Sequence, residues 1–135
     1  MILKDKISSA IIYSRVAGME FLCYRSRLKK IKLPSLELLR LRADLLLCYK
    51  ILHGHLAGSP EDYGLRVKRN SLTRGHSHQL FTDHSRVDAR KHFFSSRIVK
   101  PWNSLPSKIV NCVTIASFKS ELRSHSLRKF LVQRL

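Results

Sequence analysis

Histidines are the first residues of this sequence whose type and spacing could do chemistry. They form two close pairs, His53 with His55 and His76 with His78, and Cys112 follows later in the chain. Imidazole nitrogen and thiolate sulfur are ligands that Zn²⁺ prefers in proteins. The spacing fits no zinc finger, ribbon or knuckle, and most of the histidines fall in a segment typical of a loop. We therefore expect no metal site, and no motif indicates a cofactor.

Carboxylates are too few and too scattered for acid–base or two-metal chemistry. The chain has 9 Asp plus Glu, and Glu61 and Asp62 are the only adjacent pair, in a turn-rich stretch. The segments GHSHQ and GSPED do not match the phosphate-binding pattern GxxxxGK[ST], and no GxSxG nucleophile motif or Cys–His relay is evident. We predict no catalytic residue and no enzyme activity for this chain alone.

Positive charge is the strongest chemical signal in the chain. Lys plus Arg number 26 against 9 acidic residues in 135 residues, which gives a formal net charge of +17. Such a balance favours an anionic partner, nucleic acid more than a membrane surface. Because few aromatic residues accompany the basic ones, no platform for stacking single-stranded bases is predicted. The alternative is that other parts of a larger protein balance this charge.

Residues 55–92 are predicted to form a basic middle arm. Glycines and a proline interrupt its first part and no sustained apolar period follows, so we expect a loop with short strands near 65–67 and 79–81. Phosphate contacts from such an arm would give affinity without sequence choice and would weaken steeply with salt. A solvated basic surface is the alternative. The candidate nucleic-acid-binding residues, in the arm and just after it, are Arg66, Lys68, Arg69, Arg74, Arg86, Arg90, Lys91 and Arg97.

Helices are predicted before and after this arm in the sequence, and they must hold its two ends in place. Residues 1–18 carry a weak helical pattern, and a basic amphipathic segment follows, which Pro34 ends. The strongest helix extends from Ser35, a predicted N-cap, to Gly54, a predicted C′ residue. Its apolar stripe is wide enough to need partners on more than one side. The stripe consists of Leu38, Leu41, Leu45, Cys48 and Leu52, widened by Leu39, Leu46 and Tyr49.

Two features of this helix concern its polar residues and its thiol. Arg40 and Asp44 are four residues apart, a spacing that allows a surface ion pair worth only ~0.3–0.5 kcal/mol. Cys48 lies on the apolar stripe and is predicted to be a core thiol.

An odd number of cysteines without a CxxC pair indicates no disulfide framework, and no segment approaches the ~20 apolar residues of a membrane span. We expect a soluble intracellular protein, nuclear or cytoplasmic, that is not secreted and has no membrane partner.

The stretch FFSSRIVKPWNSLPSKIV, residues 93–110, contains the single tryptophan of the chain. Because Pro101 lacks an N–H and clashes with the preceding turn, we predict a short helix that is bent before Trp102. A second short helix with Pro106 in its first turn and a last helix capped by Thr114 are expected to follow. Helical spacing relates the apolar residues Phe94, Ile98, Trp102 and Leu105.

Packing is the predicted role of this stretch. Trp102 is interpreted as a packing anchor rather than a base-stacking residue, because it falls on the apolar spacing. Asn103 is predicted to cap the turn before Leu105, since asparagine side chains bond nearby backbone groups. Arg97 and Lys100 are expected to face outward. The predicted structural residues are Phe94, Trp102, Asn103, Leu105, Pro106 and Phe118.

An ordered series of motifs occupies roughly residues 20–127: IKLPSLELLRLRADLLLCYKILHG, TRGHS, RKHFFSSRIVKPWNSLPSKIV and FKSEL. The series resembles the segment that closes the reverse transcriptase of non-long-terminal-repeat retrotransposons of the jockey and chicken-repeat type. That family has the blocks RLKxLxLxSLExRRxRxDL, YKIL, RGHS, FFxxRxxxxWNSLP and FKxxL in this order. Each block is weak alone, and their joint order is specific. Leu39 departs from the pattern, because the family often has a second arginine there.

The resemblance implies a region downstream of the fingers, palm and thumb of an RNA-directed DNA polymerase. The paired aspartates of the polymerase motif [FY]-x-D-D are absent from this chain, as is anything like the element's endonuclease. The chain is therefore interpreted as an orphan C-terminal fragment that binds RNA or DNA nonspecifically. A small basic host nucleic-acid-binding protein and a helical protein-docking module are the alternatives.

The predicted fold is mainly α, a small helical segment with an irregular basic middle arm. Four regions are expected: a weak helix over 1–18, a helical pair over 19–54, the basic arm over 55–92, and the Trp-Asn-Leu-Pro segment with a C-terminal helix over 93–135. The helical pair is expected to dock on the missing polymerase core, the second expected partner. This dependence leaves open whether the segment is stable alone.

Overall fold

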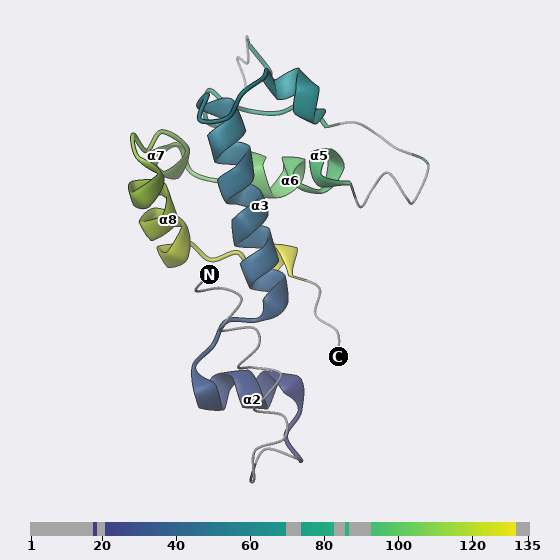
Figure 1. Ribbon diagram of the computed structural model, residues 1–135, viewed down its shortest axis with the longest axis vertical. Helices are drawn as coiled ribbons and strands as arrows, with labels where there is room; N and C mark the ends of the chain where they lie inside the picture. Colours follow the sequence, from purple (N-terminus) through teal and green to yellow (C-terminus); the bar gives the residue numbers. More distant parts are fainter. Residues whose placement is uncertain (1–17, 19–20, 70–73, 83–85, 87–92, 132–135) are drawn as a thin grey trace. The chain divides into compact units, whose positions relative to one another are not determined.

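A computed structural model describes residues 18, 21–69, 74–82, 86 and 93–131. Their structure is mainly helical, as predicted, and the weak helix expected over 1–18 lies outside the described residues except for Gly18. The chain divides into two compact units, Met1–Arg40 and Leu41–Leu135. The elements are α2 (Tyr24–Ile31), α3 (Leu36–Leu52), η2 (Pro60–Tyr63), α5 (Phe94–Arg97), α6 (Val99–Asn103), α7 (Ser107–Val110), α8 (Ile115–Ser124) and η3 (Arg128–Phe130) (Figure 1).

None of the helices in the described part of the chain is both long enough and apolar enough to cross a membrane.

The first unit contains α2 and the start of α3. Helix α2 ends at Ile31 because Lys32 adopts a left-handed conformation with a φ of 54°, so the helix stops before Pro34 is reached. The predicted N-cap of α3 is confirmed, since Ser35 Oγ accepts a hydrogen bond from the Leu38 N–H at 3.2 Å.

Helix α3 ends as the sequence predicted. Gly54 has a φ of 73°, which glycine adopts without steric cost. Its N–H donates to the Ile51 carbonyl at 3.3 Å, and the His55 N–H donates to the Lys50 carbonyl at 2.8 Å. These two bonds are those of a Schellman motif, and they satisfy carbonyls that the end of a helix leaves without partners.

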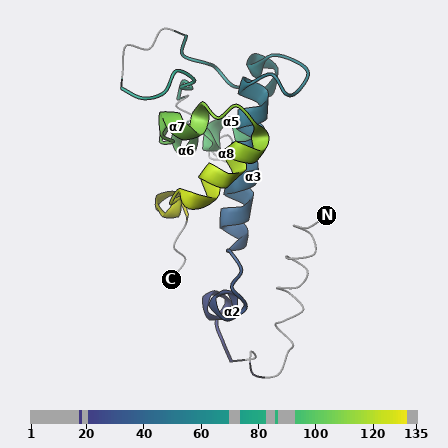
Figure 2. The same ribbon diagram turned by 90° about the vertical axis from the view of Figure 1, so that its left-hand side faces the viewer.

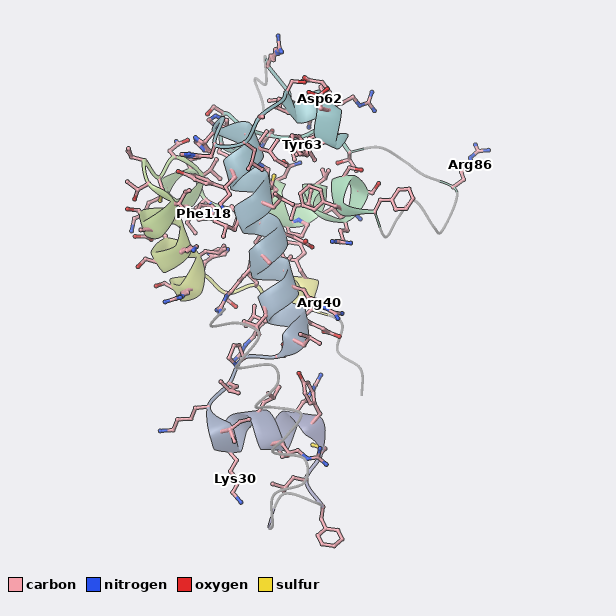
Figure 3. The ribbon with its side chains drawn as sticks, in the orientation of Figure 1. Lys30, Arg40, Asp62, Tyr63, Arg86 and Phe118 are labelled. Atoms are coloured by element: carbon pink, nitrogen blue, oxygen red, sulfur yellow. The ribbon has the colours of Figure 1, made fainter. Side chains whose placement is uncertain are left out.

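The core of the second unit lies where α3 meets α6 and α8 (Figures 1 and 2). The rings of Tyr49 and Phe118 stack with centroids 4.3 Å apart, and Trp102 lies 6.3 Å from Phe118. Figure 3 shows Phe118 between α8 and α3. All three aromatic side chains are fully buried, and Trp102 lies in the core of this unit. Cys48 is buried in the same core, and burial raises the pKa of its thiol.

The leucine stripe of α3 is thus covered by this chain over its C-terminal half. Leu45, Cys48 and Tyr49 are buried within the second unit. Docking on a polymerase core stays a prediction for the rest of the stripe. The Tyr49 hydroxyl also donates to the Cys112 carbonyl, and this bond ties α3 to the turn between α7 and α8.

The helix around Pro101 is interrupted before Trp102, as predicted. The break falls at Ile98, between α5 and α6. Pro101 is the third residue of α6, and backbone N–H groups in the first turn of a helix have no partner within that helix. The missing N–H of proline therefore costs α6 no hydrogen bond. Pro106 precedes α7 as its N-cap rather than standing in its first turn. Thr114 caps α8 as expected, with its Oγ1 accepting from the Ser117 N–H at 3.1 Å.

The basic arm is more ordered in its middle than the sequence predicted. A single antiparallel bridge pairs Val67 with Leu80 in place of the two expected strands. The Lys68 N–H donates to the Gln79 carbonyl and the Phe81 N–H donates to the Arg66 carbonyl, both at 2.8 Å. Leu65 and Leu80 are buried, so this part of the arm belongs to the core of the second unit.

The predicted ion pair between Arg40 and Asp44 is replaced by a different one. Arg97 Nε donates to Asp44 Oδ2 at 2.9 Å, and the second terminal nitrogen of Arg97 donates to Oδ1 at 3.0 Å. A guanidinium that bonds both oxygens of a carboxylate forms a stronger contact than a single ion pair with the flexible side chain of Arg40 on the same helix. Arg97 therefore ties α5 to α3 instead of facing solvent alone.

Candidate nucleic-acid interface

Two sequence motifs, RGHS and WNSLP, interlock in the second unit. The Trp102 indole N–H donates to the His78 carbonyl at 2.8 Å. In the reverse direction, His76 Nε2 donates to the Trp102 carbonyl at 3.0 Å, since a carbonyl can only accept. The side-chain amide of Asn103, the residue after Trp102, also joins the two motifs, because it bonds the backbone of Leu80. We call these five residues, His76, His78, Leu80, Trp102 and Asn103, the Trp102 lock.

Asn103 does not cap its own turn, contrary to the sequence prediction. Its Oδ1 accepts from the Leu80 N–H at 2.8 Å, and its Nδ2 donates to the Leu80 carbonyl at 2.9 Å. In the bridge, Leu80 stands opposite Val67 in the pair that exchanges no hydrogen bonds, so both backbone groups of Leu80 point away from Val67. The Asn103 amide satisfies them as a neighbouring strand would.

Gly75 allows the RGHS loop to close onto this lock. It has a φ of 134°, and a Cβ built there would lie 2.0 Å from Gln79 Nε2. The side-chain nitrogen of Gln79 occupies the place of that Cβ, and from there it donates a hydrogen bond to the Arg74 carbonyl, with the nitrogen and oxygen 3.0 Å apart. The RGHS box is therefore a structural motif, and only the Arg74 side chain of the box is left as a candidate cation.

The bridge presents a cationic and aromatic surface to solvent. Because side chains alternate along extended backbone, burial of Leu65 and Leu80 turns Arg66 and Phe81 outward. Phe81 is 51% exposed, and Lys68 Nζ lies 5.6 Å from the centroid of its ring. We call Arg66, Lys68 and Phe81 the Phe81 face. It combines cations for phosphates with a ring on which a base can stack.

Phe81 was not among the predicted binding residues. The signal was present, because an aromatic next to a core leucine in a short extended segment must take the opposite face. The sequence predicts a strand near 79–81, but the small number of aromatic residues in the chain predicts no platform for stacking bases. Without the pairing of Val67 with Leu80, nothing in the sequence places Phe81 beside Lys68.

The other predicted binding residues do not all gather on the Phe81 face. Arg69, Arg74 and Arg86 are exposed, and Figure 3 shows Arg86 pointing away from the helices of the second unit. Arg97 is engaged with Asp44. The two remaining predicted cations, Arg90 and Lys91, lie outside the described residues.

The first unit has a basic surface of its own on α2. Arg25, Lys29 and Lys30 are exposed, and α2 has no acidic residue in its first turn. Tyr24 is 51% exposed and Phe21 is 98% exposed beside them in the sequence. This helix therefore offers cations and aromatic side chains that the predicted binding residues did not include.

Three histidines lie in or beside the Trp102 lock: His76 and His78 belong to it, and His53 lies next to His78. His53 Nε2 donates to the Val110 carbonyl at 2.9 Å, and its ring centroid lies 4.9 Å from that of His78. Burial lowers the pKa of His53, His76 and His78, and repulsion between neighbouring histidines lowers it further for His53 and His78. His76 Nδ1 is buried without a hydrogen-bond partner, so a proton there would have no acceptor.

Within the described residues, no three His, Cys, Asp or Glu side chains gather as metal ligands do.

The lowered histidine pKa values predict that mild acid destabilises the protein. Between the folded pKa values and the unfolded value of about 6.5, the unfolded chain binds more protons than the folded one. The free energy of unfolding should therefore be highest above this window and should fall as pH drops through it. Urea unfolding at neutral pH and at mildly acidic pH measures the difference.

Single histidine variants assign that pH dependence. His76→Gln keeps a donor for the Trp102 carbonyl and removes one of the three titrating groups, so it should reduce the dependence, while His53 and His78 keep the remainder. His125→Gln, at the end of α8 and outside the lock, is the control and should leave it unchanged. An equal pH dependence in wild type and in the His76→Gln variant would assign the effect to other groups.

Comparison of the chain with protein-family models, curated proteins and solved structures finds no match. The resemblance stated above rests on the motifs alone. The structure gathers one residue of each principal motif in a single core: Tyr49 of YKIL, His76 of RGHS, Trp102 of WNSLP and Phe118 of FKSEL. These motif residues therefore pack in the core of the second unit.

Proposed function

We propose that this chain is the C-terminal segment of a non-long-terminal-repeat retrotransposon reverse transcriptase, and that it binds RNA or DNA through its basic surfaces. It carries no polymerase chemistry by itself. The ordered motifs support the assignment to that family. The Phe81 face is the single observation that carries the binding function, because it joins two cations to an exposed aromatic ring.

The physical basis of the proposed binding is electrostatic. A formal charge of +17 attracts any polyanion, and release of counterions from the nucleic acid supplies most of the affinity. Phosphate contacts alone carry no sequence preference. Stacking on Phe81 would add a preference for single strands, since bases in a duplex already stack on one another.

A protein-docking module has less support as the main function. The leucine stripe that suggested it is buried by α6 and α8 over its C-terminal half, as described above. A contact with the polymerase core would then use the rest of the stripe or the exposed aromatic residues next to α2. The small host nucleic-acid-binding protein differs from the first proposal in origin and not in its binding surface.

Binding to a single-stranded RNA is expected to weaken linearly in a plot of log affinity against log salt. Each lost phosphate contact should reduce the slope by about 0.7 for single strands, so Arg66→Gln with Lys68→Gln should reduce it by about 1.4. Fluorescence anisotropy of a labelled poly(U) oligonucleotide across a NaCl series measures both quantities. A slope unchanged by the double substitution would remove these two residues from the interface.

The aromatic part of the Phe81 face has a separate test in the same assay. Phe81→Ala should weaken single-strand binding by ~1–3 kcal/mol while leaving the salt slope unchanged. Phe93→Ala is the control, because Phe93 is also an exposed phenylalanine, at 58%. Equal losses in the two variants would mean that stacking is not specific to the Phe81 face.

The origin of the chain is tested by sequence. Genomic DNA and transcripts upstream of the codon for Met1 should contain an in-frame [FY]-x-D-D segment, intact or decayed. A transcript that begins there under its own promoter, with no polymerase remnant upstream, would instead support the host nucleic-acid-binding protein.

A further inference from the structure

The side chains of helix α2 divide into an apolar side and a cationic side. Tyr24, Leu28 and Ile31 stand at positions i, i+4 and i+7, which share one side of a helix. Leu28 is buried, and the Tyr24 hydroxyl accepts a hydrogen bond from the Leu36 N–H at 3.1 Å. Contacts within the first unit therefore use the apolar side of α2.

The cationic side of α2 is exposed to solvent. We call the three exposed cations of this helix the α2 surface: Arg25, Lys29 and Lys30. Figure 3 shows the Lys30 side chain extending away from the ribbon of α2. Among the described residues of the first unit, Glu37 on α3 is the only acidic residue. None of the three cations forms an ion pair with a carboxylate of the described residues, so their charge is not balanced there.

Helix stability accounts for only part of this charge. Lys29 and Lys30 stand in the last turn, where a cation interacts favourably with the negative end of the helix dipole. Arg25 stands in the first turn, which has no acidic residue and where the dipole disfavours a cation. An anionic partner therefore explains a guanidinium at this position better than the stability of the helix does.

The geometry of the α2 surface fits a duplex of nucleic acid. Its cations are held on a helix of 8 residues, which is about 12 Å long. A duplex carries one charge per ~1.7 Å of its axis in a fixed array, so along this length it offers more phosphates than the surface has cations. No aromatic ring lies among the three cations, because Phe21 precedes the helix and Tyr24 belongs to the apolar side. Single-stranded bases therefore have no stacking platform on the α2 surface.

An anionic bilayer fits this helix less well. A helix that lies in a membrane interface inserts a free apolar face between the lipids. The apolar side of α2 is already engaged within the first unit, through burial of Leu28 and through the hydrogen bond of Tyr24. What α2 exposes is mainly charge.

We propose that the α2 surface binds the phosphate backbone of a nucleic-acid duplex. Its three cations contact phosphate oxygens and read no bases, so duplex binding carries no sequence preference. Under the proposed function, on which the choice of nucleic acid rests, the Phe81 face takes single strands. The two surfaces then divide the duplex and single-stranded parts of a nucleic acid between them.

Salt dependence of duplex binding tests the α2 surface. The probe is a labelled DNA duplex of mixed sequence, titrated with the full chain and followed by fluorescence anisotropy across a NaCl series. Each lost phosphate contact reduces the slope by about 0.9, so Arg25→Gln with Lys29→Gln should reduce it by about 1.8. The matched control, Lys100→Gln with Lys119→Gln, removes two exposed cations of the second unit and should leave the slope unchanged. An unchanged slope in the α2 variant, or equal reductions in both variants, would overturn the proposal.

Thermal stability of Arg25→Gln separates binding from a structural role. The substitution removes a cation from the first turn of α2, so the melting temperature should stay the same or rise while the affinity for the duplex falls. A lower melting temperature would make Arg25 a structural residue and would overturn its place in the α2 surface.

Two further probes separate this proposal from the proposed function. Phe81→Ala should weaken poly(U) binding and leave duplex binding unchanged. Poly(U) binding that depends on Phe81, with duplex binding that ignores the α2 substitutions, would overturn the α2 surface and leave the proposed function intact. Duplex binding that the α2 substitutions abolish, with poly(U) binding that ignores Phe81, would support the α2 surface and overturn the Phe81 face. Binding to phosphatidylserine vesicles that the α2 substitutions abolish, without any binding of the duplex, would assign the surface to a membrane and overturn the proposal.

Discussion

Replacement of Trp102 by alanine is expected to cost ~3–5 kcal/mol of unfolding free energy, the largest effect of any single substitution in this chain. The side chain is fully buried, packs edge-on against His76 and lies next to Phe118. Its loss would open a cavity and leave the His78 carbonyl without the indole donor. Since small domains are stable by only ~5–15 kcal/mol, the variant would lose a large share of its stability.

Denaturant unfolding followed by circular dichroism measures this loss. Trp102→Phe separates packing from hydrogen bonding, because it keeps a ring and removes the N–H, and its cost should be intermediate. Phe81→Ala is the control from the exposed surface and should change stability by less than ~0.5 kcal/mol. Loss of RNA binding in the Trp102→Ala variant at unchanged thermal stability would show that Trp102 binds RNA and is not a packing anchor.

Asn103→Ala is expected to have the second-largest effect, a loss of ~2–4 kcal/mol. The Asn103 amide satisfies both the N–H and the carbonyl of Leu80, whose side chain is fully buried. Alanine would leave both backbone groups without partners in a place that water reaches poorly. The loss should be larger than that of a single hydrogen bond for this reason.

Asn103→Asp isolates one half of this interaction. The carboxylate has the same shape and can accept from the Leu80 N–H, but it cannot donate to the Leu80 carbonyl and it repels that oxygen. Asn111→Ala, at the exposed C-cap of α7, is the control and should cost less than ~0.5 kcal/mol. Urea unfolding of the three variants gives the comparison, and equal costs for Asn103→Ala and Asn111→Ala would contradict the pairing with Leu80.

Features of the fold that depend on neighbours in sequence could be predicted. The caps at Ser35, Gly54 and Thr114 are local, because a side chain or a glycine acts on backbone groups a few residues away. The mainly helical fold and the burial of Cys48 and Trp102 follow from apolar spacing in the same way.

Features that depend on distant segments could not. Asp44 has Arg40 four residues before it, and only the folded chain shows that Arg97 reaches it instead. Asn103 was assigned to its own turn because sequence shows only local partners, whereas Leu80 lies 23 residues earlier. The Phe81 face depends on the bridge between Val67 and Leu80 in the same way.

The order in which the chain leaves the ribosome gives the contact between α3 and α8 a further consequence. Tyr49 is synthesised early, and the groups that cover it come late: the Cys112 carbonyl is 63 residues away in sequence, and Phe118 follows it. During that part of translation, the apolar side of α3 lacks its partner from α8. Nascent chains in this condition recruit chaperones or aggregate. Completion of this core therefore waits until Phe118 has been synthesised, and contacts between such distant residues form slowly.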